Sequence, residues 1–276
     1  LRPLPFLKDT PGLRMDMALF YENIRRMDYA IGELMTTVGT LGLAGNTLVI
    51  FTTDHGIAFP RAKATLYDPG IHTALLMRWP EGFQGGRSLP ALVSNVDLFA
   101  TLMDLVHEPL SAECNGRSFL NVLRGESAEA RRMVFAEKNT SPKDIKRCVR
   151  TSRYKYIRNY TEGPQLELPF DIEISATRRD MGDDHLALRP AVELYNLADD
   201  PWEKANVAGQ PAYSDIESDL DNKLKEILEE TQDPLLRGAI QRPKEEAEIV
   251  ARLWRPDSVQ QKTANEAELH RALERL

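Results

Sequence analysis

The stretch NTLVIFTTDHG, from Asn46 to Gly56, constrains the fold more than any other part of the sequence. Its centre is a near-continuous apolar run, the pattern of a strand that is buried on both faces. Such strands lie in sheets with parallel pairing that helices cover on both sides. The run ends in an aspartate, a histidine and a glycine. Because open α/β sheets hold their ligands at the carboxyl ends of strands, we expect a functional site there.

The segments around this strand follow the order of an α/β protein. Apolar residues recur every three or four positions from Met17 to Leu41, which predicts a long helix that ends at Gly42. TALLMRW (73–79) has the pattern of the next strand, and SNVDLFATLMDLV (94–106) that of a helix. The face by which we expect this helix to pack contains Phe99, Leu102 and Val106. We therefore predict the distal part of a doubly covered mixed or parallel sheet.

A different pattern begins near residue 126. Short segments with β-branched and aromatic residues, separated by turn formers, predict a smaller α+β subdomain with an antiparallel sheet. Residues 163–189 lack periodicity and suggest a long surface loop, whereas residues 214–230 have the pattern of an amphipathic helix. The predicted parts are 1–130 for the α/β domain, 131–235 for the subdomain and 236–276 for a charged, helical tail.

Composition excludes several classes of protein. The net charge of -7 and the absence of a Lys/Arg stripe argue against nucleic-acid binding. No apolar run reaches the length of a membrane span. Cys114 and Cys148 neither form a disulfide framework nor have zinc-ligand spacing, so they leave the compartment undecided. The first residues include no initiator methionine, and we expect the natural start to lie upstream.

Asp54 and His55 are candidate metal ligands. An adjacent carboxylate and imidazole can ligate one cation from a single turn, and Lys63 could neutralise an anion that this cation also binds. Together these groups would suit a phosphate or sulfate ester. From spacing alone, a polar turn followed by a solvated lysine is an equally good interpretation.

Four segments resemble, in the same order, the C-terminal portion of the sulfatase family within the alkaline-phosphatase-like superfamily. They are NTLVIFTTDHG, KATLYDPGIHTALLMRWPEG, NVDLFATLMDL and ELYNLADDPWEKANVAG. Residues 26–63 are most similar to the sulfamidase (heparan N-sulfatase) branch, in which a short Gly-Ile-Xaa-Phe-Pro loop and a basic residue follow the metal-binding dipeptide. The resemblance extends over roughly residues 14–235.

The resemblance implies roles for five residues. Asp54 and His55 match the family's second pair of metal ligands, and Lys63 matches the residue that contacts the sulfate. Arg61 would take that role if the match between this sequence and the family were shifted by two positions. His185 lies in a loop that resembles the region over the substrate pocket, although a solvated histidine is the alternative. The implied metal is Ca²⁺. Many relatives have an asparagine where this chain has His55, and an imidazole softens an oxygen-rich calcium site, so Mg²⁺ and Mn²⁺ stay open as alternatives.

The nucleophile of the family has no counterpart in this sequence. Sulfatases use a formylglycine made from the Cys or Ser of a Cys/Ser-x-Pro-x-Arg motif, and neither Cys114, Cys148 nor Ser88 has the required proline and arginine. The first pair of metal-binding aspartates is also missing. We therefore expect a fragment of a hydrolase that acts on sulfate esters or N-sulfamates of sugars, including glycosaminoglycans, with the nucleophile supplied by an upstream half of the catalytic domain.

Further expectations follow from this resemblance. The 276 residues alone should be inactive, the protein should be extracytoplasmic if it follows the family, and a homo-oligomer is possible. Two alternatives remain open: a phosphomonoester or diester hydrolase of the same superfamily, and a binding or assembly module without catalysis. The identity of the missing nucleophile motif would separate the first alternative from a sulfatase.

Overall fold

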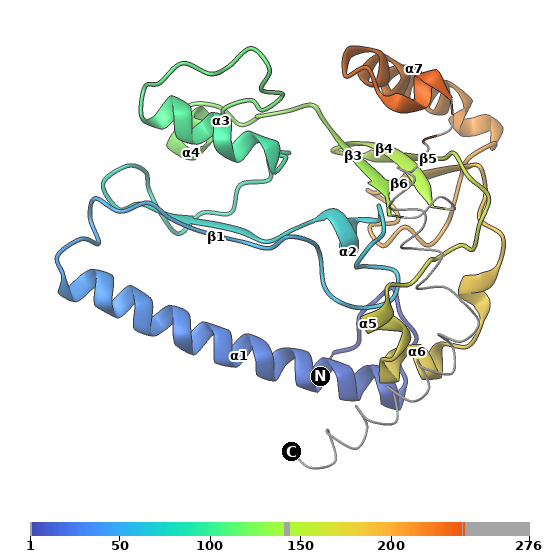
Figure 1. The fold of residues 1–276 in the computed structure, drawn as a ribbon, viewed down its shortest axis with the longest axis horizontal. Coiled ribbons are helices and arrows are strands. Elements are labelled where there is room, and N and C mark those ends of the chain that lie inside the picture. Colours follow the sequence, from blue (N-terminus) through green and yellow to red (C-terminus); the bar gives the residue numbers. More distant parts are fainter. Residues whose placement is uncertain (1, 141–143, 239, 241–276) are drawn as a thin grey trace, which may run out of the picture. The chain divides into compact units, whose positions relative to one another are not determined.

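The computed structural model describes residues 2–140, 144–238 and 240 (Figure 1). The chain divides into two compact units, residues 1–227 and 228–276. The helices are α1 (Pro11–Thr40), α2 (Asp68–Ile71), α3 (Val96–Leu105), α4 (Leu120–Arg124), α5 (Phe170–Glu173), α6 (Ala176–Met181) and α7 (Ser214–Glu230). The strands are β1 (Val49–Thr52), β2 (Leu75–Arg78), β3 (Met133–Asn139), β4 (Ile145–Thr151), β5 (Tyr154–Asn159) and β6 (Val192–Asn196). Short 3₁₀ helices are η1 (Asp184–Leu186), η2 (Pro211–Tyr213) and η3 (Pro234–Arg237).

Helix α1 confirms the long helix predicted from the apolar periodicity. Thr10 caps its start, with a hydroxyl oxygen that accepts from the Leu13 amide at 3.1 Å, and Gly42 follows its end with a φ of 71°. The first turns are fixed against α6, where the Gly12 amide donates to Asp180 at 2.7 Å. The described part of the chain leaves most of the remaining helix exposed.

Strands β1 and β2 form a two-stranded sheet (Figure 1). Their pairing is antiparallel, with Val49 opposite Arg78, so our expectation of parallel pairing next to this strand was wrong. The physical reason is the connection: residues 53–74 contain only the one-turn helix α2, whereas a parallel crossover needs a longer covering element. Strand β1 is also only half-buried. The mixed α/β class is confirmed, with antiparallel sheets.

Helix α3 forms where predicted but buries a different face. Its buried side contains Asp97, whose carboxylate accepts from the Ser94 amide at 2.9 Å and pairs with Arg131. This ion pair and the contacts with α4 turn the predicted packing face outward. The residues of that face are exposed: Phe99, Leu102 and Val106.

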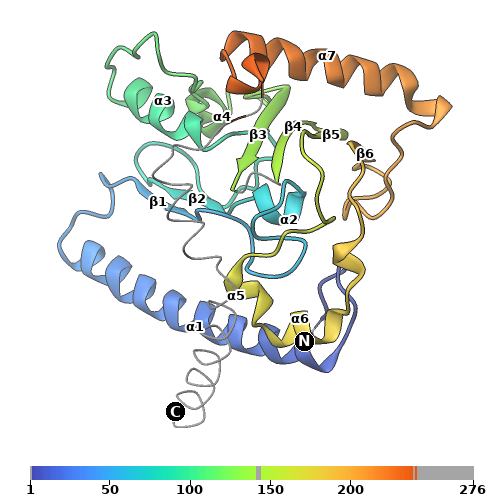
Figure 2. The ribbon, with the colours of Figure 1, turned by 45° about the vertical axis from the view of Figure 1, so that its right-hand side comes forward.

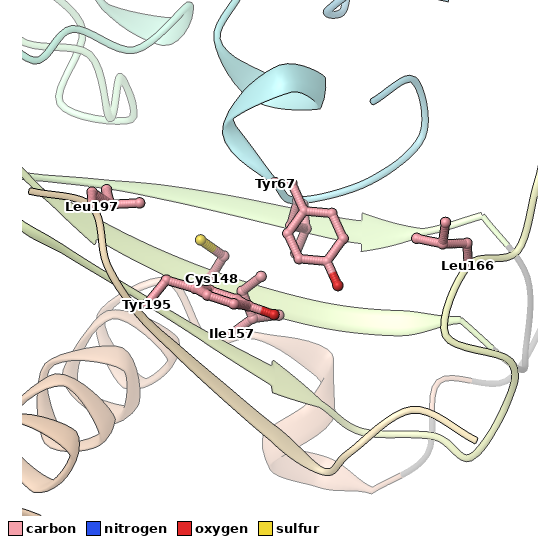
Figure 3. Close-up of a cluster of buried hydrophobic side chains, with 7 residues drawn as sticks. Tyr67, Cys148, Ile157, Leu166, Tyr195 and Leu197 are labelled. Carbon is pink, nitrogen blue, oxygen red and sulfur yellow. The ribbon is translucent and has the colours of Figure 1, made fainter. Parts of the chain in front are cut away.

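The predicted antiparallel sheet is confirmed in the order β3-β4-β5-β6. Figures 1 and 2 show α2 on one side of this sheet and α7 on the other. On the α2 side, Tyr67 packs onto a buried cluster of the sheet that includes Cys148, Ile157 and Tyr195 (Figure 3). On the other side, the Tyr156 hydroxyl donates to Asp221 of α7 at 2.7 Å. Residues from both predicted parts thus share one core.

Residues 163–189 are not the surface loop that we predicted. They contain α5, α6 and η1, and they bury Leu166 and Ile172. These elements are too short for a periodic pattern to reveal them. The boundaries proposed at residues 130 and 235 stay predictions, and residues 241–276 of the predicted helical tail lie outside the described residues. In the described part of the second unit, which begins at residue 228, the Asp233 side chain caps η3.

No helix in the described residues combines the length and the apolar character that crossing a membrane requires.

Candidate active site

Asp54 and His55 lie together directly after β1. The connection between β1 and β2 is closed by a hydrogen bond between its two ends, in which the Thr53 hydroxyl accepts from the Ala74 amide at 3.1 Å. The His55 amide donates to Asp54 Oδ1 at 3.0 Å, and His55 Nε2 lies 3.6 Å from the same oxygen. The Asp54 side chain is 87% exposed and that of His55 is 35% exposed. The two groups therefore face each other and are open to a ligand.

The hydrogen bond of His55 Nδ1 defines the state of its ring. Nδ1 lies 2.6 Å from the Gly56 carbonyl oxygen, which can only accept. Nδ1 therefore donates this hydrogen bond, and in the neutral ring this tautomer would leave the lone pair of Nε2 on the side of Asp54. A backbone carbonyl that fixes the tautomer in this way is typical of metal-ligating histidines.

A glycine is required at position 56 because the backbone there lies too close to α2 to leave room for a side chain. Its amide donates to the Gly70 carbonyl at 2.8 Å, which attaches the Asp-His-Gly turn to α2. A Cβ at this position would lie 1.8 Å from the Pro69 carbonyl oxygen. Gly56 is not among the residues with positive φ, so close approach explains this glycine better than the sharp turn suggested by the sequence.

Helix α2 is in turn held by a buried cluster of charges. Asp68 pairs with Lys155 at 2.5 Å and with Arg150 at 2.9 Å, and its amide donates to Glu203 at 2.6 Å. Burial alone would raise the pKa of Asp68, but Lys155 and Arg150 outweigh it and lower the pKa. Burial raises the pKa of Glu203, against the opposing effect of Lys155. The position of the candidate site thus depends on residues of the predicted subdomain, 131–235.

A cavity of about 650 Å³ opens beside Asp54 and His55. Its wall consists of the connection to α2, residues 93–95 and the edge strand β3, including Glu137 and Lys138. The sequence did not predict the β3 wall. The only available signal was a pair of charged residues within an otherwise apolar strand pattern.

The structure does not place Lys63 or Arg61 in this wall. The Lys63 ammonium pairs with Asp171 of α5 at 2.7 Å. The Arg61 guanidinium lies 4.2 Å from the centroid of the Tyr67 ring and donates to the Glu203 carbonyl. Of the predicted site residues, only Asp54 and His55 are therefore brought together at the cavity.

His185 is buried rather than solvated, with 4% of the residue exposed. Its carbonyl oxygen accepts from the Leu166 amide at 3.1 Å, whereas neither ring nitrogen has a hydrogen-bond partner within the described ranges. His185 is also not part of the cavity wall. The proposed contact between His185 and substrate stays a prediction.

Asp54 and His55 fit the role of ligands to one divalent cation, because a carboxylate oxygen and an available imidazole nitrogen face each other. In the part of the chain that the structure describes, no group of three or more His, Cys, Asp or Glu residues could hold a metal. The two thiols are free, and burial raises the pKa of Cys148 to about 12, which disfavours the nucleophilic thiolate.

Residues 9–108 match the family model described as Sulfatase, and the predicted resemblance to sulfatases is confirmed. An "Ulvan-active sulfatase" from Formosa agariphila is 29% identical and is matched over 95% of this chain and 45% of its own length. Human "N-sulphoglucosamine sulphohydrolase" is also 29% identical, over 83% of this chain and 51% of its own length.

A solved structure, of a protein in complex with its substrate D-glucosamine-2-N,6-O-disulfate, has the same fold. It superposes with a TM-score of 0.61 at 21% identity, over 76% of this chain and 40% of that one. The chain spans about half the length of the curated relatives that it matches.

Proposed function

We propose that this chain, in its intact protein, hydrolyses sulfate esters or N-sulfamates of sugars with the help of a divalent cation. The observation that carries the proposal is the pairing of Asp54 with His55, whose Nε2 lies 3.6 Å from the Asp54 carboxylate, in the wall of the cavity. Ca²⁺ is the first candidate, with Mg²⁺ or Mn²⁺ as alternatives. The cation would neutralise charge on the sulfuryl oxygens.

Lys63 is the proposed second partner of the sulfate. Its present contact with Asp171 joins side chains that are 27% and 51% exposed, and such exposed pairs contribute at most about 1 kcal/mol. An anion beside the metal ligands would therefore compete readily for the ammonium. Arg61 is a weaker candidate, because Tyr67 and Glu203 already hold its guanidinium.

The nucleophile in this proposal is a formylglycine from an upstream half of the catalytic domain. Cys148 is buried, and Cys114 is followed by neither the proline nor the arginine of the modification motif. Apolar side chains that the described structure leaves exposed would suit a packing surface for that half: Leu19 and Leu34 on α1, Leu76 on β2, and Phe99 on α3. An extracytoplasmic location is part of the same proposal.

The substrate class rests on the names of the relatives, one of which is a sulphohydrolase of N-sulphoglucosamine. The test is to express the natural gene with its upstream sequence and to measure sulfate released from N-sulfoglucosamine and from an aryl sulfate. We expect metal-dependent release that is lost in Asp54→Ala and His55→Ala but retained in the control His72→Ala, whose histidine is exposed after α2 and is not in the cavity wall.

Release of phosphate from aryl phosphate or phosphodiester, without release of sulfate, would instead favour the phosphoester hydrolase. If both activities survived the substitution of Asp54 and His55, the assignment of the metal ligands would be refuted. We expect the 276-residue chain alone to release no sulfate.

A further inference from the structure

Glu203 is a buried carboxylate that contacts the connection between β1 and β2 at two points. The residue has no exposed surface. Its carboxylate accepts from the Asp68 amide at 2.6 Å and lies 2.7 Å from the ammonium nitrogen of Lys155. Its backbone carbonyl accepts from the guanidinium of Arg61. A single residue, in a turn that follows β6, thus holds the connection both before α2 and at the first residue of α2.

The contact with Asp68 leads through α2 to the candidate metal ligands. Asp68 is the first residue of α2, and the Gly70 carbonyl of the same helix accepts from the Gly56 amide at 2.8 Å. Gly56 directly follows His55, whose Nδ1 lies 2.6 Å from the Gly56 carbonyl oxygen. The approach of Gly56 to α2 leaves no room for a Cβ. A displacement of α2 would therefore displace the turn that carries Asp54 and His55.

Glu203 also lowers the stability of the fold in two ways. Its φ is 55°, a value that is uncommon for residues other than glycine. Burial raises the pKa of its carboxyl, against the opposing effect of Lys155, so folding disfavours the ionised form. Apolar residues of similar size can often replace a buried ion pair without loss of stability, so stability alone does not explain this carboxylate. Residues with strained backbones gather at functional sites, where placement matters more than stability.

We propose that Glu203 is a positioning residue, which sets the place of Asp54 and His55 through α2 and thereby the affinity of this pair for a divalent cation. This inference rests on the proposed function and adds to it a residue that lies outside the cavity wall. Glu203 contacts neither Asp54 nor His55 among the hydrogen bonds and ion pairs of the described residues, so it acts on the cation only through the backbone that it holds.

The test is the affinity of the intact protein, expressed with its upstream sequence, for Mn²⁺, measured by calorimetric titration at a temperature at which the variants are folded. Glu203→Gln keeps an oxygen that can accept from the Asp68 amide but loses the charge beside Lys155. We expect it to bind Mn²⁺ about tenfold more weakly, the lower end of the range for residues that orient a metal ligand. Glu203→Asp keeps the charge but is one methylene shorter, and should also weaken binding because it cannot reach both partners.

Asp221→Asn is the matched control. The Asp221 carboxylate accepts from Tyr156 and from Arg158, each at 2.7 Å, on the face of the sheet opposite α2 (Figures 1 and 2). Its substitution also removes the charge of a carboxylate that pairs with a cation, but at a place that does not contact the connection between β1 and β2. We expect the temperature of thermal unfolding to fall in both Glu203→Gln and Asp221→Asn, and the Mn²⁺ affinity to fall only in Glu203→Gln.

Unchanged Mn²⁺ affinity in either folded variant of Glu203 would overturn the inference, and so would an equal loss of affinity in Asp221→Asn. If neither variant of Glu203 folded, the residue would serve the fold alone, and the inference would be overturned as well. Failure of the proposed function has a different signature, because Asp54→Ala and His55→Ala would then leave the Mn²⁺ affinity unchanged. If these two variants lost affinity while Glu203→Gln did not, the inference alone would fail.

Discussion

Gly56→Ala tests whether the Asp-His-Gly turn is positioned by its contact with α2. The added Cβ would lie 1.8 Å from the Pro69 carbonyl oxygen, and real Cβ contacts are essentially never below 3.0 Å. The separation must therefore grow by about 1.2 Å, from 1.8 to 3.0 Å. Such a shift breaks the 2.8 Å hydrogen bond from the Gly56 amide to Gly70.

The expected loss of stability follows from these two effects. Forced overpacking destabilises by about 1–3 kcal/mol, and the lost hydrogen bond adds about 1 kcal/mol. We therefore expect the free energy of unfolding, measured by urea denaturation with circular dichroism, to fall by about 2–4 kcal/mol. Backbone strain from a positive φ adds nothing here, because Gly56 does not have one.

Gly32→Ala is the matched control. Gly32 lies within α1, and a Cβ there would have nothing within 4 Å. Alanine in place of glycine in a helix should stabilise by about 0.5–1 kcal/mol. If Gly56→Ala unfolded at the same urea concentration as the unsubstituted chain, the steric argument would be refuted.

Three other substitutions test separate parts of the structure. Lys155→Met removes the cation shared by the buried carboxylate of Glu203 and the partly buried carboxylate of Asp68, and should lower the free energy of urea unfolding by about 3–5 kcal/mol; a loss below about 1 kcal/mol would contradict the charge cluster. Burial would raise the pKa of Asp97, but Arg131 and backbone amides outweigh it and lower the pKa. The stability from this depressed pKa is present above the unfolded value of about 3.9 and is lost as pH falls through the folded value. Asp97→Asn should therefore be less stable at pH 7 and lose less on acidification, and an unchanged pH profile would count against the pair. In the intact enzyme, Lys63→Ala should reduce turnover about 10²-fold, whereas near-normal turnover would exclude the role and make Arg61 the next candidate.

The elements with long, regular patterns could be predicted from the sequence. Helix α1 follows from apolar residues at threes and fours over its length, and Gly42 marks its end. The short segments with β-branched and aromatic residues that begin near residue 126 correctly indicated the antiparallel sheet. The place of Asp54 and His55 at the end of β1 was also evident, because a polar pair directly follows an apolar run.

Features that depend on contacts between distant segments could not be predicted. The apolar face of α3 has the same periodicity whether it is buried or exposed, so the exposure of Phe99 left no signal. The burial of His185 depends on short elements between residues 163 and 189 that are too brief for periodicity. The contribution of β3 to the cavity wall depends on how the sheet packs beside β1, which no local pattern encodes.

Asp54 and His55 are the proposed ligands of a divalent cation in the intact protein. The most direct measurement is a crystal structure of the intact protein grown with Mn²⁺, with the ion located by its anomalous diffraction. We expect a peak about 2.0–2.6 Å from a carboxylate oxygen of Asp54 and from Nε2 of His55. A bound ion in the catalytic domain that neither residue ligates would contradict this assignment.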